Sequence, residues 1–67
     1  MEKTNRVQEL RWEKNYSIGQ LVRFTGLSRG TISKIENDNY DPTRSQMIRL
    51  ARAFKKPVGE VFDLEHL

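Results

Sequence analysis

SIGQLVRFTGLSRGTISKIEN, residues 17–37, decides the fold of this chain of 67 residues. Ser17 and Ser28 each stand where a helix would begin, because a serine hydroxyl accepts a hydrogen bond from a backbone N–H of the first helical turn. Gln20, three residues after Ser17, completes a capping box. Gly26 lies between the two serines, and glycine takes the left-handed conformation that ends many helices. The stretch therefore predicts two short helices joined by a tight turn at residues 25–28.

The second of these helices, over residues 29–37, has two different faces. At about 100° per residue, Ile32 and Ile35 fall together on an apolar face. The opposite face and its flanks carry small, hydroxylated and basic residues: Gly30, Ser33, Lys34 and Asn37, flanked by Arg29 and Thr31. One face that packs and one face that is polar and basic are typical of a helix-turn-helix, whose second helix enters the major groove of DNA.

Helical patterns also cover the rest of the chain. One helix is expected from about Thr4 or Asn5, either of which would cap it, to Lys14, with Asn15 ending it in a left-handed conformation. Val7, Leu10 and Trp12 supply its apolar side.

Two further helices are expected after residues 37–42, which are dense in turn-forming residues. Thr43 caps a helix that extends to about Lys55, with an apolar stripe made of Met47, Ile48, Leu50, Ala51 and Phe54. Pro57 opens a short helix to Phe62. The sequence predicts one all-α domain of five helices over residues 1–67, with its core within about 5–62 and a tail, 63–67, that is either a short strand or a frayed end.

The composition narrows the function classes. The chain has no cysteine, so neither a disulfide framework nor a thiolate metal site is expected. His66 has no second ligand at metal spacing, so no metal or other cofactor is expected, nor a small-molecule ligand. No Gly-rich phosphate loop or nucleophile–base pair suggests an enzyme. No apolar run reaches the roughly 18 residues of a membrane span, and no signal peptide is evident, so a cytoplasmic protein is expected.

Charge is distributed unevenly along the chain. Residues 1–56 hold all 12 Lys and Arg residues against six of the nine acids, whereas residues 57–67 hold the other three acids. No acid lies between Ser17 and Ile35, where Arg23, Arg29 and Lys34 stand. A basic body suits contact with phosphate, and an acidic end should face away from it. The alternative is ordinary surface charge.

The sequence resembles the Xre family, the Cro and phage-repressor type of helix-turn-helix DNA-binding domain. The resemblance covers about residues 5–62 and rests on these residues: Ser17, Leu21, Gly26-Leu27-Ser28, Thr31-Ile32-Ser33-Lys34-Ile35-Glu36-Asn37, Tyr40 and Pro42. It implies a bundle of five helices in which the second and third form the helix-turn-helix. It also implies that Arg11 and Glu36 pair between helices, orienting the recognition helix. Two positions depart from the family. Ile18 stands where the family often has a glutamine that contacts phosphate, and Gly30 stands where it often has a polar residue that reads a base.

The polar face of residues 29–37 supplies the candidate DNA contacts. Arg29 and Lys34 are candidates for base reading, since both donate to O6 and N7 of guanine; the alternative for both is contact with phosphate alone. Ser33 and Gly30 share this face, and Gly30 either allows close approach to DNA or accommodates the turn. The candidates for phosphate contact are short polar, aromatic and basic residues: Ser28, Thr31, Asn37, Asn39, Tyr40 and Arg11.

These features predict a sequence-specific binder of double-stranded DNA that acts as a transcriptional repressor. A homodimer on a palindromic or repeated operator is expected, because one recognition helix buries little surface. The acidic C-terminal segment is the expected dimer interface, through Val58, Val61, Phe62, Leu64 and Leu67. Two alternatives stay open: an antitoxin-like or adaptor protein that binds a protein partner through Trp12, Phe24 or the tail, and a DNA-bending factor of a mobile element.

Overall fold

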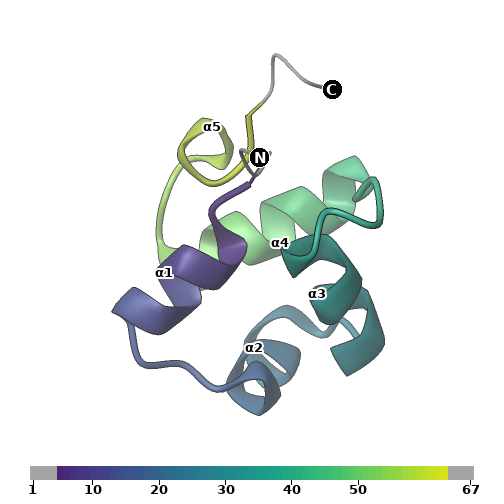
Figure 1. The fold of residues 1–67 in the computed structure, drawn as a ribbon. Coiled ribbons are helices and arrows are strands. Elements are labelled where there is room, and N and C mark those ends of the chain that lie inside the picture. Colours follow the sequence, from purple (N-terminus) through teal and green to yellow (C-terminus); the bar gives the residue numbers. More distant parts are fainter. Residues whose placement is uncertain (1–4, 64–67) are drawn as a thin grey trace.

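The longest helix, α4 (Arg44–Phe54), lies at the centre of the fold (Figure 1). The computed structural model describes residues 5–63, and within them α1 (Val7–Glu13), α2 (Ile18–Thr25) and α5 (Val58–Val61) all contact α4. The remaining helix, α3 (Arg29–Glu36), packs on α1 and α2. The expected all-α arrangement of five helices is therefore confirmed over these residues.

The core is small and draws on every helix. Its buried apolar side chains are Val7, Leu10, Leu21, Ile32, Ile35, Leu50, Ala51, Phe54, Val61 and Phe62. Phe54 is the largest fully buried side chain, and the ring of Tyr16 stacks on it with a centroid distance of 6.3 Å. Met47 and Ile48, also expected in the α4 stripe, are only partly buried. The fold thus rests on a few well-enclosed side chains, each of which contributes on the order of 1.5–3 kcal/mol of burial free energy.

The helix ends follow the local signals in the sequence. Ser17 Oγ accepts a hydrogen bond from the Gln20 backbone N–H at 3.1 Å, and Gln20 Oε1 accepts one from the Ser17 N–H at 2.8 Å. Thr43 and Gln46 repeat this capping box at the start of α4. Gly26 ends α2 at φ 77°, and Asn15 follows α1 at φ 57°. The caps predicted at Ser17, Ser28 and Thr43 are confirmed. The cap predicted for the first helix is not, because Arg6 stands at the N-cap position of α1 without a side-chain cap hydrogen bond. Of the two residues expected there, Asn5 precedes this position and Thr4 lies outside the described residues.

The first helix differs from the prediction. α1 spans Val7–Glu13 and is shorter at both ends than expected. Trp12 was expected on its apolar side, but 61% of its surface is exposed. It lies two residues after Leu10 and five after Val7, which turns it away from the face that those two residues bury.

The two ends of the described chain meet. Asn5 and Phe62 form an isolated antiparallel bridge, and the Arg6 N–H donates to the Val61 carbonyl at 2.7 Å. Val61 and Phe62 are 1% and 4% exposed. Their assignment to a dimer interface is therefore wrong, because both side chains are enclosed by their own chain. Val58 is partly buried against the same core, and the other two residues of the expected interface, Leu64 and Leu67, lie outside the described residues.

Asn5 connects the start of α1 to the end of α3. Its Oδ1 accepts a hydrogen bond from the Val7 N–H at 2.9 Å, one residue beyond the N-cap residue Arg6. Its Nδ2 donates to the Ile35 carbonyl and to Asp38 Oδ1, both at 2.9 Å. The side chain thus holds together two segments that lie about 30 residues apart in the sequence.

We predict that Asn5→Ala lowers the free energy of unfolding by about 1–3 kcal/mol, because it leaves the Val7 N–H without its side-chain partner and removes one of the two hydrogen bonds to the Ile35 carbonyl. Denaturant unfolding monitored by circular dichroism measures this change. Asn39→Ala is the control, since Asn39 is exposed, and it should shift stability by less than about 0.5 kcal/mol. Equal stability of the two variants would contradict the structural role of Asn5.

Candidate nucleic-acid interface

The turn between α2 and α3 is held by the side chain of Thr25. Its hydroxyl donates to the Leu21 carbonyl at 2.6 Å and accepts from the Leu27 N–H at 3.1 Å. Ser28 then caps α3 by accepting a hydrogen bond from the Thr31 N–H at 3.1 Å. These local bonds fix the angle at which α3 leaves α2.

Arg49 of α4 also holds this turn through a hydrogen bond to its backbone. Its Nη1 donates to the Thr25 carbonyl at 3.1 Å. Glycine is favoured at position 26 by its φ of 77°, and a Cβ added there would also lie 3.0 Å from this Nη1, which would have to shift slightly. The sequence analysis missed this role of Arg49. The signal that would have found it is the position of Arg49 beside Leu50, at the edge of the buried stripe.

The faces of α3 separate as its periodicity predicted. Ile32 and Ile35 are fully buried, whereas Gly30, Lys34 and Asn37 are exposed. Ser33 lies on the same outward side and is partly exposed. The outward face is therefore flat in the first turn of α3, where Gly30 stands, and carries longer side chains further along.

Arg29 is exposed at the start of α3. Its guanidinium lies beside the first turn of α2, where a Cβ added to Gly19 would be 3.7 Å from Nη2. Within residues 5–63, the salt bridges of the structure do not involve Arg29, Lys34 or Arg23. These three exposed cations give the α2–α3 unit a positive surface.

Some of the candidates for phosphate contact already form hydrogen bonds within the chain, and others do so less. Ser28 Oγ donates to Thr31 Oγ1 at 2.9 Å besides capping the helix. Asn37 is exposed, and its Nδ2 donates to the Ser33 carbonyl at 3.0 Å. Asn39 is exposed in the following loop, whereas Tyr40 packs against the core. All of these residues lie in α3 or within four residues of its ends.

Arg11 and Glu36 form a salt bridge between α1 and the end of α3. Arg11 Nε and Nη2 donate to the two carboxylate oxygens of Glu36 at 2.7 and 3.3 Å. Arg11 Nη1 also donates to the Tyr16 carbonyl at 3.2 Å. The two side chains are only 13% and 4% exposed. This geometry turns most of the guanidinium inward, so the pair acts first as a positioning element for α3.

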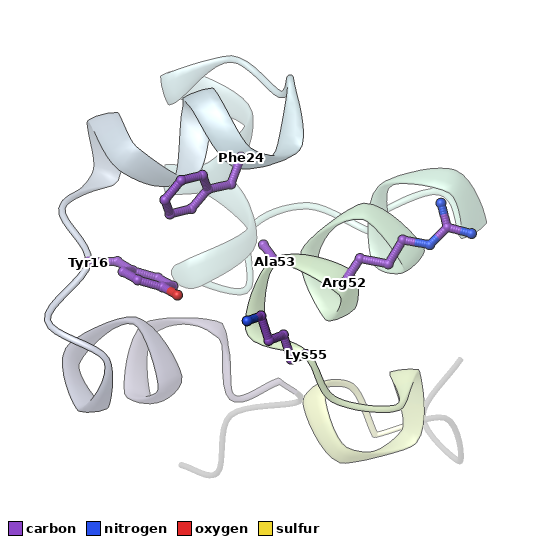
Figure 2. Close-up of a pocket in the computed structure, with 5 residues that line it drawn as sticks. All are labelled: Tyr16, Phe24, Arg52, Ala53 and Lys55. Carbon is purple, nitrogen blue, oxygen red and sulfur yellow. The ribbon is translucent and has the colours of Figure 1, made fainter.

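A pocket of about 410 Å³ lies away from α3, between the C-terminal ends of α2 and α4 (Figure 2). Phe24 is 54% exposed there, and its ring meets the Tyr16 ring edge to face at a centroid distance of 5.2 Å. Ala53, Arg52 and Lys55 complete the lining. The pocket therefore combines an exposed aromatic ring with two cations.

The described residues offer neither a metal centre nor a membrane span. In that range no group of three or more His, Asp or Glu side chains is arranged to hold a metal ion. None of the helices between residues 5 and 63 is long and apolar enough to cross a membrane.

The geometry of α2, its glycine turn and the basic, outward face of α3 define a helix-turn-helix DNA-binding protein. The chain belongs to this class by descent as well: a family model described as "Helix-turn-helix domain" matches residues 4–67. It is an Xre-family helix-turn-helix protein. It is 34% identical over 61 residues, 91% of this chain and 92% of the relative, to the Bacillus subtilis (strain 168) protein named "Uncharacterized HTH-type transcriptional regulator YgzD".

We predict that Arg11 and Glu36 are strongly coupled. Either Arg11→Gln or Glu36→Gln alone should lower the free energy of unfolding by about 3–5 kcal/mol, because each leaves a charge buried without its partner. The double variant should lose much less than the sum of the two. A double-mutant cycle by denaturant unfolding measures the coupling.

Arg6 and Glu9 provide the matched control, since they form a salt bridge at 3.1 Å with side chains 45% and 59% exposed. Their coupling should stay within the roughly 0.2–1 kcal/mol of exposed pairs. A coupling between Arg11 and Glu36 no larger than this control value would contradict the positioning role.

Proposed function

We propose that this chain is a sequence-specific regulator of transcription, and that it represses by occupying operator DNA as a dimer. The observation that carries the proposal is the acid-free, exposed basic face of α3, which Ile32, Ile35 and the Arg11–Glu36 salt bridge anchor from behind. The "transcriptional regulator" in the name of its Bacillus subtilis relative supports the same conclusion. Such a protein acts in the cytoplasm, where it meets its operator DNA.

The arrangement suits reading of the major groove. Arg29 stands at the start of α3 with its guanidinium exposed and Lys34 follows on the outward face. Arginine gives the bidentate contact to guanine O6 and N7 that is the commonest specific contact in the major groove. Asn37 and Asn39 lie at the other end of α3, where they suit contact with the phosphates that fix the register of the helix.

The single recognition helix supports a dimer. One copy offers one such helix of eight residues, and helix-turn-helix dimers bind two half-sites one turn of DNA, about 34 Å, apart. Two copies related by a two-fold axis would place their α3 helices one turn apart on a palindromic operator. Bound there over a promoter, the dimer would exclude polymerase.

The Phe24 pocket is the surface that we assign to dimerisation. Residues 63–67, DLEHL, contain two acids and two leucines and no Lys or Arg. The pocket offers complementary groups, because Phe24 and Tyr16 present aromatic surface, and Lys55 and Arg52 supply positive charge to its lining. We assign this acidic, leucine-containing segment of one copy to the pocket of the other. The occupant of the pocket is thus a second copy of this chain.

Selection of bound sequences from random double-stranded DNA, followed by footprinting, tests the proposed function directly. The expected result is a motif of two half-sites whose centres lie about 10 base pairs apart, one helical turn. Binding without any sequence preference would contradict the proposal.

We predict that Arg29→Ala loses about 1–3 kcal/mol of binding free energy on the selected site and relaxes the preference at one position in each half-site. Asn37→Ala is the comparison, because loss of a phosphate contact should weaken binding to all sequences alike. Repeating the selection with both variants measures the difference. An unchanged motif for the Arg29 variant would rule out base reading by this residue.

We predict that removal of Leu64–Leu67, or Phe24→Ser, yields a folded monomer that binds its operator weakly. Sedimentation at micromolar concentration measures the oligomeric state. Arg52→Glu should weaken the dimer by charge repulsion, and Arg52→Glu combined with Glu65→Lys should restore it. A truncated chain that is still dimeric, or a charge swap that restores nothing, would show that this pocket is not the dimer surface.

A further inference from the structure

Gly30 is a glycine that the fold does not require. It is exposed in the first turn of α3, its φ lies in the ordinary helical range, and a Cβ added there would meet nothing within 4 Å. Gly26 provides the contrast, since its φ is 77° and a Cβ would lie 3.0 Å from Arg49. Packing and backbone conformation thus explain Gly26 and leave Gly30 unexplained.

A side chain at position 30 would favour the folded state. Glycine has more conformational freedom to lose on folding than alanine, so glycine in a helix is the less stable choice. The free space around Gly30 means that alanine would bring this gain without a steric cost. A residue that lowers stability and serves no contact within the chain points to a constraint from outside the chain.

The position of Gly30 on α3 indicates what that constraint is. Ser33 and Lys34 follow it by three and four residues, so all three lie on the outward face. The N-terminal residues of a recognition helix are the ones that come nearest to the base edges. Gly30 therefore stands at the point of α3 where the helix comes closest to DNA.

We propose that Gly30 is a specificity-determining position at which the absence of a side chain is the functional feature. This inference rests on the proposed function. The bare backbone of the first turn comes into van der Waals contact with the base edges of the major groove. The short hydroxyl of Ser33, one turn further along, reaches the bases only when the helix lies that deep. A side chain at position 30 holds α3 away and withdraws both Ser33 and the neighbouring Arg29 from the bases.

The test compares three variants on the selected operator and on random DNA at the same salt concentration. Gly30→Ala should raise the melting temperature by about 2–5 °C and yet weaken operator binding about tenfold, while binding to random DNA, which depends on phosphate contacts, changes little. Gly30→Leu, with a bulkier side chain, should weaken operator binding by more than about a hundredfold.

Gly59→Ala is the matched control. Gly59 is also the second residue of its helix and is exposed, but α5 packs on α4, away from α3 (Figure 1). This variant should leave operator binding unchanged, and its melting temperature is measured alongside that of Gly30→Ala. Operator binding by Gly30→Ala within twofold of the unaltered chain would overturn the inference and leave the proposed function intact. Absence of selective binding by the unaltered chain would overturn both.

Discussion

The salt bridge between Arg11 and Glu36 is the interaction on which the recognition surface depends. It joins the C-terminal residue of α3 to α1, and the same guanidinium donates to the carbonyl of Tyr16 in the connection to α2. Three segments are therefore fixed by one buried arginine. The two side chains are nearly enclosed. Removal of either one would therefore leave the charge of the other buried and uncompensated, at a cost of several kcal/mol. In a domain of this size, that cost is comparable with the whole free energy of unfolding.

The same salt bridge also shapes the electrostatics of the surface. Glu36 is the acid that follows the acid-free stretch of residues 17–35. Its carboxylate points inward to Arg11 and not outward beside Lys34. A negative charge that would otherwise repel phosphate next to the recognition helix is thus neutralised inside the fold. Orientation of α3 and the positive sign of its outer face follow from one contact.

The sequence predicted those features of the fold that depend on neighbouring residues. The capping box of Ser17 and Gln20, the left-handed Gly26 and the two faces of α3 are all local, and each was found where the pattern placed it. Features that depend on distant residues could not be predicted in this way. The hydrogen bond from Arg49 to Thr25 spans 24 residues. It depends on how α4 crosses α2, which no local pattern encodes.

The C-terminal segment shows the same limit most clearly. Its apolar residues were read as a surplus that a second copy would cover, but the bridge between Asn5 and Phe62 draws Val61 and Phe62 into their own core. The exposed apolar surface of the described chain lies instead at Trp12 and Phe24. The number of apolar residues in a segment indicates how much apolar surface must be buried. It does not indicate whether the same chain or a second copy buries that surface, because this depends on the pairing of the two chain ends.

The two faces of α3 have different roles: the inward face packs on the domain and the outward face is exposed. Ile32, Ile35 and Glu36 face inward and hold α3 in place. Gly30 and Lys34 face outward and are exposed, and a Cβ added to Gly30 would meet nothing within 4 Å. Substitutions on the outward face therefore leave the packing that holds α3 in place unaltered, whereas substitutions at Ile32, Ile35 or Glu36 disturb it.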